Sequence, residues 1–475
     1  MHDVAAALGR LSELADSSSV SRLAAAFDDA GHELALVGGP VRDAFLGRVT
    51  NDLDFTTDAT PDEILAIVKP IADAHWDIGR AFGTIGARIA GETVEITTYR
   101  ADSYDGASRK PEVVFGDSLD GDLIRRDFSV NAMALRLPRL ELVDPSGGVE
   151  DLMARVLRTP SRPEESFGDD PLRMLRAARF SAQLGFDVEP GTREAMSALA
   201  AEIDRISAER VRDELSKLLL ADSPVRGIRL LVDSGLADRV LPEVPALRLE
   251  RDEHHRHKDV YEHSLTVLEQ AIDYEKTRGV LDSPDLVMRL GALLHDIGKP
   301  ATRRLEPGGA VTFHHHDVIG AKLAKKRLRA LRFDNDTVAA VARLIELHLR
   351  FFGYSDGAWS DSAVRRYVRD AGDQLERLHI LSRADVTTRN RRKADHLAFA
   401  YDDLEERIAV LAEEEELAAV RPELDGQQIM ALLDVPPGPV VGEAYRYLLE
   451  VRLDEGPIGE AAARERLLAW WSARP

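Results

Sequence analysis

The sequence predicts an α+β fold, with a small N-terminal head built on a mixed β-sheet and a long all-helical body after it. Between residues 31 and 147, short apolar runs of strand length alternate with helical segments and polar turns. From about residue 148 onward the pattern becomes almost wholly helical. The 475 residues allow about two to four domains. We expect segments at 1–147, 148–250, 251–400 and 401–475.

Composition narrows the class of protein. The chain is 44% hydrophobic and 31% charged, which is ordinary for a soluble globular protein. It has no cysteine, which excludes disulfides, thiolate metal sites and a cysteine nucleophile. No apolar run is long enough to cross a membrane, and the N-terminus lacks the basic start and apolar stretch of a signal peptide. We therefore expect a cytoplasmic protein with no membrane partner.

The net charge of −21 argues against broad affinity for nucleic acids, because phosphate backbones favour basic surfaces. A role on a nucleic acid would depend on local basic patches or on bound Mg²⁺. Two candidate patches are Lys322, Lys325, Lys326, Arg327, Arg329 and Arg332, and then Arg389, Arg391, Arg392 and Lys393. Each fits an RNA backbone or, equally well, a solvated helix face.

The head begins after a helical lead-in over residues 1–30. Four apolar runs predict strands, and a helix from Pro61 to Ala72, with Thr60 as a suitable N-cap, separates two of them. The predicted strands are Leu34–Val37, Leu53–Phe55, Ile85–Ile89 and Val94–Thr98.

A pair of carboxylates lies on the second predicted strand. Because a strand alternates its side chains, Asp52 and Asp54 point to one face while Leu53 and Phe55 point to the other. Two carboxylates about 7 Å apart on one face suit Mg²⁺. Nucleotidyl transfer uses a pair of such ions to activate a hydroxyl and to hold a triphosphate. The alternative is a surface strand with solvated aspartates.

Nearby residues extend this interpretation. Gly38 and Gly39 allow backbone N–H groups to approach a phosphate, beside a helix N-terminus of positive potential. Arg42 follows one turn later. Glu95 becomes a third carboxylate if its strand lies next to the aspartate strand, and is otherwise a solvent-facing residue on an edge strand.

The polar, glycine-rich segment 101–122 predicts a long mobile loop. Soon after it come Arg125, Arg126 and Asp127, which precede a helix-like run. Two arginines beside an aspartate suit a phosphate and a ribose hydroxyl. A solvated ion-pair cluster is the alternative.

A further candidate region begins at DDPLRMLRAARF. Asp169 and Asp170 would open a helix, with the acidic groups in the first turn where the macrodipole favours them. Asp170 and Arg173 lie one turn apart and together offer an acceptor and donors to the edge of cytosine or adenine. An amphipathic helix with an i,i+3 salt bridge is the alternative. Arg176 and Arg179 continue a basic stripe, which a later helix with Glu209, Arg210 and Glu214 would buttress.

Four motifs in this order resemble the class II tRNA nucleotidyltransferases, the bacterial enzymes that build CCA at tRNA 3′ ends, and their relatives the bacterial poly(A) polymerases. The motifs are LVGGPVRDAFLG with NDLDF, RRDFSVNAMA, DDPLRMLRAARF and AERVRDELSK. The resemblance covers residues 20–245 densely and the helical remainder loosely. It implies the addition of C, C and A from CTP and ATP, with Mg²⁺ as the cofactor and a tRNA acceptor end as the partner.

The resemblance also implies a role for each matched residue. The implied catalytic carboxylates and Mg²⁺ ligands are Asp52 and Asp54, with Glu95 as a third carboxylate. The implied nucleotide contacts are Gly38, Gly39 and Arg42 for the triphosphate, Arg125, Arg126 and Asp127 for the ribose, Asp170 and Arg173 for the base, and Arg176 and Arg179 for phosphate. The family usually has Glu where this chain has Asp169, which weakens any role for that residue. A loop of the length of 101–122 favours full CCA addition.

Histidines cluster in the second half, where nine of the fourteen lie between residues 254 and 348. Imidazole and carboxylate groups suit Zn²⁺, Mn²⁺, Ni²⁺ or Fe²⁺, and an open coordination position on such a metal makes a hydrolytic water. The order of VYEHSL, LLHDIGKP and LSRADVTTR resembles the HD-domain metal phosphohydrolases. It implies the ligands His263, His295, Asp296 and Asp385, and in some such families His316 and His348 would complete a second metal site or bind phosphate. We expect His254, His255, His257, His314 and His315 at the surface.

The preferred prediction is therefore template-independent CCA addition to tRNA, with a helical tail from about residue 401 like that of longer class II enzymes. A poly(A) polymerase of the same superfamily is one alternative. An HD-domain phosphohydrolase whose N-terminal half only binds nucleotide is another, and its site would hydrolyse phosphoesters such as 2′,3′-cyclic or 2′-phosphate ends. A non-catalytic RNA-binding protein is disfavoured, because a binder has no use for paired carboxylates that face phosphate.

Overall fold

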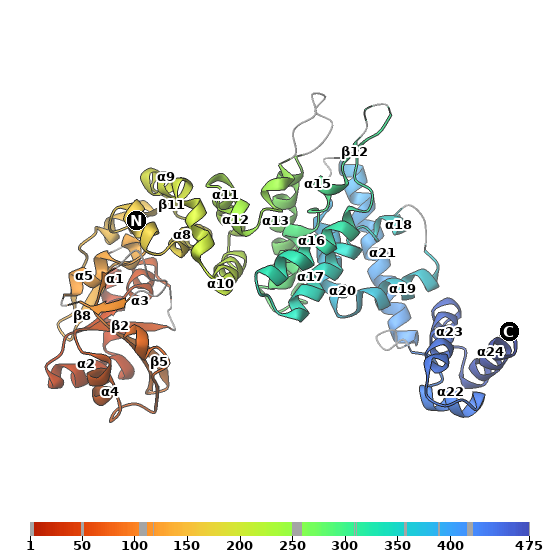
Figure 1. Ribbon diagram of the computed structural model, residues 1–475, viewed down its shortest axis with the longest axis horizontal. Coiled ribbons are helices and arrows are strands. Elements are labelled where there is room, and N and C mark those ends of the chain that lie inside the picture. The colour runs from red at the N-terminus through yellow and green to blue at the C-terminus, as the bar shows by residue number, and fades with distance from the viewer. Residues whose placement is uncertain are drawn as a thin grey trace. The chain divides into compact units, whose positions relative to one another are not determined.

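The computed structural model describes residues 4–48, 52–103, 112–116, 118–248, 259–307, 309, 311–355, 359–387, 390–415 and 421–474. The chain packs as two compact units, residues Met1–Val240 and Leu241–Pro475. Figure 1 shows the main β-sheet in the first unit and helices through most of the second. This arrangement confirms the predicted fold class, a mixed-sheet head before a helical body. The finer division into four segments stays a prediction.

The head is built on a seven-stranded mixed sheet in the order β3-β4-β5-β2-β1-β8-β9. Only β2 and β5 pair in parallel, and the other neighbouring strands are antiparallel. The strands are β1 Leu34–Val37, β2 Leu53–Thr57, β3 Ala74–Trp76, β4 Thr84–Ile89, β5 Glu92–Thr98, β8 Ala134–Leu137 and β9 Glu141–Val143. All four predicted strands are present, three of them one or two residues longer than expected.

Helices surround and follow the sheet of the first unit. The lead-in forms α1 and α2, as predicted, and Thr60 caps α4 in a capping box with Glu63. That helix ends at Val68, four residues before the predicted end. The helices are α1 Val4–Ala15, α2 Ser18–Ala30, α3 Gly39–Leu46, α4 Pro61–Val68, α5 Leu119–Ile124, α6 Gly148–Ala154, α7 Pro163–Asp169, α8 Leu172–Leu184, α9 Pro190–Ala198, α10 Ala208–Leu219, α11 Pro224–Asp233 and α12 Ala237–Val240.

Three local predictions in this unit were wrong. The predicted loop 101–122 contains two strands, because β6 (Arg100–Ser103) pairs antiparallel with β7 (Glu112–Phe115). Residues 104–111 and 117 lie outside the described residues. β-Branched and aromatic residues in EVVF favour a strand despite the polar surroundings.

The run after Asp127 is also not a helix. It forms one 3-10 turn, Ser129–Asn131, and then enters the buried strand β8. Asp169 and Asp170 do not begin α8 either. Asp169 ends α7, Asp170 is extended, and α8 begins at Leu172 with no acid in its first turn.

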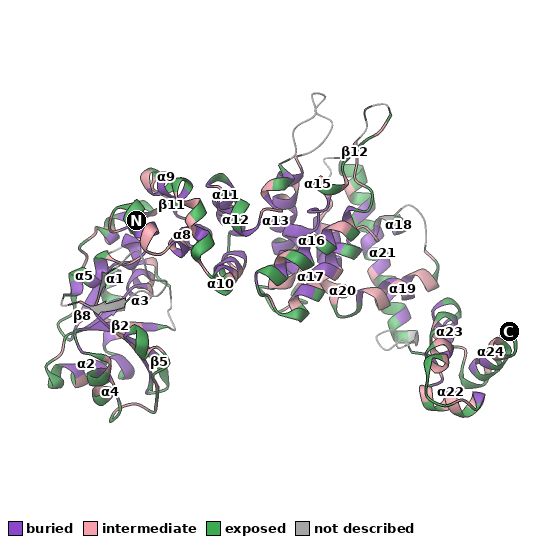
Figure 2. Ribbon diagram, in the orientation of Figure 1, coloured by how far each residue is buried: buried purple, intermediate pink, exposed green. Residues whose placement is uncertain are grey.

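In the described part of the second unit, the only strands are β12 (Arg304–Leu305) and β13 (Val311–Thr312), and the regular structure is otherwise helical. Figure 2 shows buried residues concentrated where α13, α16 and α17 lie together. Its helices are α13 Val260–Arg278, α14 Leu286–Leu294, α15 Lys299–Thr302, α16 His316–Ala330, α17 Asn335–Leu347, α18 Phe352–Ser355, α19 Asp361–Ala371, α20 Leu375–Ala384, α21 Arg391–Glu415, α22 Gly426–Leu433, α23 Pro439–Glu455 and α24 Glu460–Ser472. The last three form their own small core around Leu448 and Leu467.

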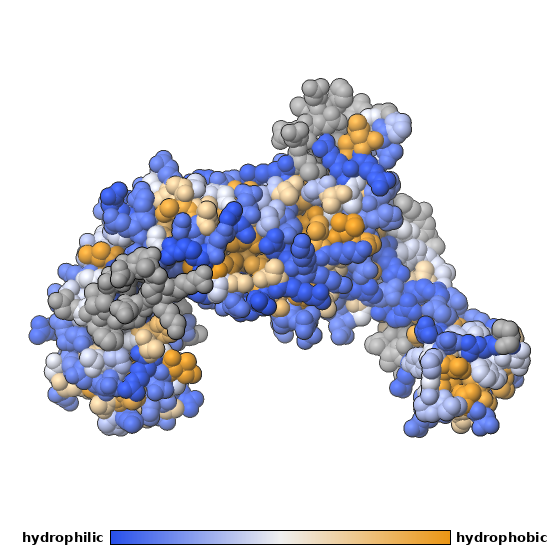
Figure 3. Space-filling model, viewed as in Figure 1, coloured by the Kyte–Doolittle hydropathy of each residue, from blue (hydrophilic) through white to orange (hydrophobic). Residues whose placement is uncertain are grey.

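Hydrophilic residues cover most of the molecular face in Figure 3, and apolar residues appear there only as scattered patches. Within the described residues, no helix combines the length and apolar character that a membrane span requires.

Candidate active site and metal centre

Three carboxylates meet at the start of β2 and its neighbour β5. The two strands pair in parallel with Asp54 directly opposite Glu95, so both side chains lie on one face at one ladder step, about 4.8 Å apart at the backbone. Asp52 lies two residues before Asp54 and shares that face. The condition under which Glu95 would join Asp52 and Asp54, that their strands are neighbours, is therefore met.

The opposite face of β2 packs into the core. Leu53 and Phe55 are 4% and 1% exposed, whereas Asp52 and Glu95 are exposed and Asp54 is half-buried. Burial raises the pKa of Asp54, and the charges of Glu95 and Asp52 add to this against the opposing effect of Arg126. Crowded carboxylates that disfavour their own ionisation gain from a divalent cation between them.

The glycine turn brings the head motifs close together. Gly38 adopts φ +71°, and a Cβ there would lie 3.4 Å from Nη1 of Arg126. Its N–H donates to the carbonyl of Met133 at 3.2 Å, so this amide is already engaged. Gly39 is the first residue of α3, where backbone N–H groups have no intrahelical partner. Of the two predicted phosphate-contacting amides, Gly39 is the better placed.

Arg42 is held inside the site. It is 6% exposed, and its guanidinium donates to Asn131 at 2.7 Å and to Asp43 at 2.9 Å. Asn131 in turn donates to Asp127 at 3.0 Å. Asn131 thus links Arg42 to Asp127. The sequence did not suggest this role, although Asn131 lies inside the motif RRDFSVNAMA.

Asp122 is a second residue that sequence reasoning missed. It is 1% exposed and accepts hydrogen bonds from Arg125 at 3.0 Å and Arg126 at 3.1 Å. Thr56 of β2 also donates to it at 3.3 Å. Burial by itself would raise the pKa of Asp122, but the two arginines hold it below its usual value. An acid three and four residues before two arginines was the available signal.

A chain of ion pairs connects the head to the helices that follow it. Asp127 accepts from Nε and Nη2 of Arg176 at 2.7 and 2.6 Å. Glu214 of α10, 4% exposed, lies 3.7 Å from Arg176 and accepts from Arg179 at 2.7 Å. Burial would raise the pKa of Asp127, but Arg176 and the amide of Asn131 lower it to about 2. The contacts of Glu214 fit the predicted buttress.

Phe180 is a third residue that sequence reasoning missed. Its ring is 3% exposed, and the guanidinium carbons of Arg42, Arg176 and Arg179 lie 5.4, 5.3 and 4.0 Å from its centre. The face of an aromatic ring attracts cations. One buried ring therefore gathers the three arginines that the sequence assigned to phosphate.

Asp170 and Arg173, the two residues predicted to contact the base, each bind residues other than one another. Asp170 accepts from the N–H of Leu172 at 3.1 Å and pairs with Arg210 at 2.9 Å. Arg173 donates to the hydroxyl of Ser166 at 2.9 Å and to the carbonyl of Arg125 at 2.6 Å. The structure describes both residues and shows no salt bridge between them, which argues against the i,i+3 alternative.

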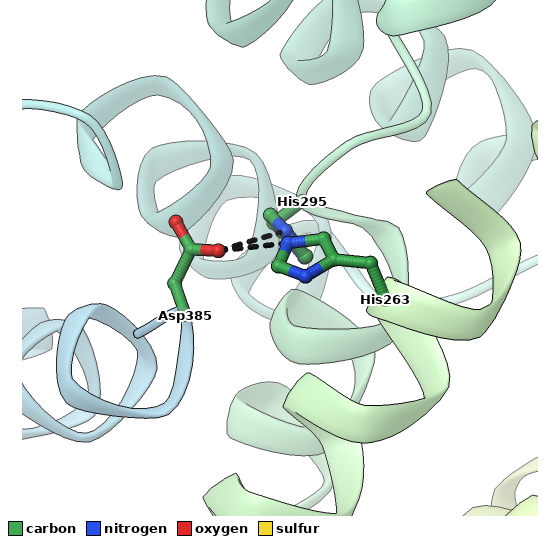
Figure 4. A group of neighbouring side chains, drawn as sticks. All are labelled: His263, His295 and Asp385. Atoms are coloured by element: carbon green, nitrogen blue, oxygen red, sulfur yellow. Dashed lines mark ion pairs between the residues drawn. The ribbon is translucent and has the colours of Figure 1, made fainter. Parts of the chain in front are cut away.

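Six side chains of the second unit converge in two adjoining groups. One comprises His263, His295 and Asp385, and the other comprises Asp296, His316 and His348; within each group the ligand atoms lie within 4.8 Å of one another. Figure 4 shows both imidazoles of the first group pointing at one carboxylate oxygen of Asp385. The distances to that oxygen are 2.9 Å from His263 and 3.6 Å from His295.

Asp296 joins the two groups. One of its oxygens lies 3.2 Å from Nε2 of His295, and the other lies 3.3 Å from Nε2 of His316. Lys299 approaches it within 2.6 Å. The resemblance implied Asp296 as a ligand, and the structure places its two oxygens between the two groups.

Three histidines of the centre are oriented in the same way. Each Nδ1 lies 2.6–2.8 Å from the backbone carbonyl three residues earlier, in His295, His316 and His348. A carbonyl only accepts, so Nδ1 carries the proton and Nε2 offers its lone pair. Burial, with His295 nearby, lowers the pKa of His348 to about 4, which keeps this imidazole neutral, as a metal ligand must be.

The donor atoms of this centre fit a metal. The three Nε2 atoms and one oxygen of Asp296 are buried without a hydrogen-bond partner among the described residues. A buried polar group without a partner costs about 1–3 kcal/mol, and four such atoms that face one another would be satisfied by cations. Imidazole nitrogens with carboxylate oxygens suit transition metals better than Mg²⁺.

The other predicted features lie at the surface or outside the described residues. His314 and His315 are exposed, as expected, while His254, His255 and His257 lie outside the described part. Of the basic patches, Arg389 also lies outside it, and Arg327 pairs with Glu243 at 2.9 Å. The remaining exposed cations are Lys322, Lys325, Lys326, Arg329, Arg332, Arg391, Arg392 and Lys393.

Known sequence families match three successive parts of the chain. A family described as "Poly A polymerase head domain" matches residues 34–158, and one described as "Probable RNA and SrmB- binding site of polymerase A" matches residues 185–247. The HD domain family matches residues 260–390. The first match contains the three carboxylates, and the last contains all six side chains of the histidine centre.

Two relatives match along almost their whole length. An A-adding tRNA nucleotidyltransferase of Deinococcus radiodurans is 36% identical over 92% of this chain and 95% of its own. This chain belongs to the tRNA nucleotidyltransferase family. A CC-adding tRNA nucleotidyltransferase of Thermus thermophilus is 33% identical over 92% of this chain and 94% of its own. A CCA-adding enzyme of Leuconostoc mesenteroides is 40% identical, but over 47% of this chain and 54% of its own.

Solved structures of tRNA nucleotidyltransferases share the fold. The CCA-adding enzyme of Bacillus stearothermophilus, determined in complex with CTP, superposes with a TM-score of 0.65 at 23% identity. The match covers 96% of this chain and 98% of that one. Members of this family use divalent metal ions, and the three carboxylates and the histidine centre are the groups of this chain suited to hold them.

Proposed function

We propose that this protein adds C, C and A to the 3′ end of tRNA from CTP and ATP, with Mg²⁺ held by Asp52, Asp54 and Glu95. The observation that carries the proposal is the pairing of Asp54 opposite Glu95 with Asp52 on the same face. The names of the relatives support tRNA as the substrate class.

In this reaction the 3′-oxygen of the RNA forms a bond to the α-phosphorus of the nucleotide. The bond from that phosphorus to the bridging oxygen breaks, pyrophosphate leaves, and the hydroxyl loses its proton. Bound Mg²⁺ would supply charge for the attacking oxygen and the triphosphate. Arg42, Arg176 and Arg179, which one phenyl ring holds together, would neutralise the negative charge that leaves with pyrophosphate.

We assign ribose recognition to Arg125, Arg126 and Asp127, and base recognition to Asp170 and Arg173. Asp170 is fixed by Arg210 and by the N–H of Leu172. The guanidinium of Arg173 is anchored by Ser166 and by the carbonyl of Arg125. The carboxylate of Asp170 can accept and the guanidinium of Arg173 can donate hydrogen bonds at the edge of a base. A small rotation of the two side chains would suit either cytosine or adenine.

The base-recognition role is tested by replacing Arg173 with Ala. We expect the ratio of CTP to ATP incorporation to change about tenfold, since one good bidentate contact is worth about 1–3 kcal/mol of discrimination. Arg193→Ala, an exposed arginine paired with Asp233, is the control. An unchanged ratio in Arg173→Ala would remove the assignment.

The overall activity is tested on tRNA transcripts that end at the discriminator base, at C or at CC. Each is offered labelled CTP, ATP or both, and the products are sequenced. Addition of all three nucleotides supports the proposal, and long runs of A would indicate a poly(A) polymerase. The full-length relatives are named A-adding and CC-adding, so a product with only CC, or A only on a CC end, identifies one half of a divided activity.

A second function is favoured by the histidine centre. We propose that His263, His295, Asp296 and Asp385, with His316 and His348, hold two transition-metal ions and that the centre hydrolyses phosphoesters. The position of Asp296 between the two groups and the buried lone pairs of three imidazoles support it. A bound metal would supply a nucleophilic water at neutral pH, and Lys299 would stabilise a phosphate beside Asp296. Water adds to phosphorus, and one ester P–O bond breaks.

The hydrolytic function is tested with 2′,3′-cyclic nucleotides and 2′-phosphates, in the presence of Ni²⁺, Mn²⁺ or Zn²⁺. Phosphoester hydrolysis that disappears in Asp296→Asn but persists in Asp54→Ala supports it. Hydrolysis that survives in Asp296→Asn would come from elsewhere.

A further inference from the structure

A surface pocket of about 560 Å³ lies beside the arginine network of the first unit. Three segments that are distant in the sequence line it. Arg48 comes just after α3, Arg179 and Gln183 lie on α8, and Lys217 and Asp222 lie at the end of α10 and just beyond it. Of these residues, the sequence assigned a role only to Arg179.

The pocket has unpaired positive charge. Arg179 is neutralised by Glu214 at 2.7 Å and contacts Gln183 at 3.3 Å. Arg48 and Lys217 are exposed, and neither side chain forms an ion pair with any residue that the structure describes. In a chain with a net charge of −21, two such cations in one hollow favour an anionic ligand.

The pocket is close to the three carboxylates along the chain. Arg48 precedes Asp52 by four residues, and four residues span at most about 14 Å. A strand of RNA whose 3′-hydroxyl lies at Asp52 and Asp54 can therefore reach the pocket with the nucleotides that precede its last one.

We infer that this pocket binds the sugar–phosphate backbone of the RNA directly behind the reacting 3′ end. Arg48 and Lys217 contact a phosphate, and Asp222 accepts a hydrogen bond from a ribose 2′-hydroxyl. Asp222 favours a ligand that carries a hydrogen-bond donor next to its phosphate, and the RNA backbone offers such a donor whereas an ionised triphosphate chain offers only acceptors. A 2′-hydroxyl is the group that separates RNA from DNA at such a site. The inference rests on the proposed nucleotide addition to tRNA.

The inference is tested with Arg48→Gln and Lys217→Gln, and with Lys69→Gln as an exposed control just after α4 of the same unit. We expect the KM for tRNA to rise roughly three- to tenfold in the two pocket variants, with the KM for CTP and ATP within twofold of the wild type. In each, the slope of log K for tRNA binding against log salt falls by about 0.7, because one phosphate contact to a single strand is lost. A raised KM for CTP with unchanged tRNA binding would overturn the inference.

The sugar contact is tested with primers that carry a single 2′-deoxy nucleotide at each of the last positions. Wild-type protein should bind one of these primers more weakly, and Asp222→Asn should lose that difference. Equal binding of every deoxy primer by the wild type would overturn the assignment of Asp222.

Equilibrium binding of tRNA, measured by fluorescence anisotropy without nucleotide, separates this inference from the proposed function. If the wild type adds no nucleotide, the proposed function fails, and the binding constants still report on the pocket. If the wild type adds nucleotides and the pocket variants bind tRNA as tightly as Lys69→Gln does, only the pocket inference fails.

Discussion

The carboxylates of the first unit and the histidine centre of the second are both suited to metal ions, but their surroundings are opposite. Asp52 and Glu95 are exposed, whereas His295, Asp296 and His348 are no more than 1% exposed. Oxygen ligands open to water suit a hard ion that arrives with its substrate and keeps several water molecules. Buried imidazoles with fixed tautomers suit a resident transition metal.

The cationic side chains of the two units also differ in their arrangement. In the first unit, the guanidinium groups of Arg42, Arg176 and Arg179 share the ring of Phe180, and Asp127 and Glu214 balance the charges of Arg176 and Arg179. Around the histidines, Lys299 approaches Asp296 directly. The first arrangement fits a long polyanion such as a triphosphate, and the second fits a single phosphate group.

The largest effect should come from Asp54→Ala, which removes the residue between Asp52 and Glu95. We expect nucleotide addition to fall on the order of a thousandfold or more, because the charge of the triphosphate would lose its counter-ion site. Asp58→Ala, at the other end of the same strand region and exposed, is the matched control. Single-turnover incorporation of CTP is the measurement. Near-normal incorporation by Asp54→Ala would contradict the metal assignment.

The second-largest effect should come from His348→Ala, which removes a buried imidazole of the histidine centre. We expect the affinity for Ni²⁺, Mn²⁺ or Zn²⁺ to fall roughly 10- to 100-fold, with nucleotide addition unchanged. Metal content by mass spectrometry after dialysis is the measurement, and the exposed His396→Ala is the control. A parallel loss of nucleotide addition would mean that the two sites are not independent.

Sequence patterns predicted the parts of both sites that depend on local geometry. Strand alternation predicts Asp52 and Asp54 on one face. Glu95 was expected beside them only if its strand lay next to theirs, and β5 does pair with β2. Helix-end histidines were recognised from the order of short motifs. The pairing partner of a strand is a long-range choice, so the position of Glu95 could only be stated as a condition.

The sequence did not reveal the residues that hold the predicted ones. Asp122, Asn131 and Phe180 carry no chemistry in the reaction, and their role depends on which guanidiniums the fold brings to them. The β6–β7 pairing was missed because its polar neighbours outweighed the three-residue apolar run Val113–Phe115. Local patterns therefore predict reactive groups better than their supports.

A moderate effect on stability is expected from Asp127→Asn. Arg176 and Asn131 lower the pKa of the buried Asp127 to about 2 from 3.8, so the ionised form stabilises the fold above pH 3.8 and this contribution is lost as pH falls through 2. The variant should be less stable by about 2 kcal/mol at pH 7, and the difference from the wild type should shrink towards zero between pH 4 and pH 2. Urea unfolding of the wild type and the variant over this range measures it, with the exposed Asp213→Asn as the control. A difference that stays constant down to pH 2 would show that the charge of Asp127 is not its cause.

The smallest effect should come from Phe180→Leu, which keeps an apolar side chain but removes the ring that three guanidiniums face. Each cation–π contact contributes about 0.5–1 kcal/mol or more where water is excluded, and its loss allows Arg42, Arg176 and Arg179 to adopt other rotamers. We expect the KM for both CTP and ATP to rise about three- to tenfold with a smaller change in kcat. Phe186→Leu is the matched control, since this phenylalanine is 2% exposed and the described residues place no guanidinium over its ring. Both variants should lose similar stability. If the KM rises equally in both, the effect is one of packing, and Phe180 does not position the arginines.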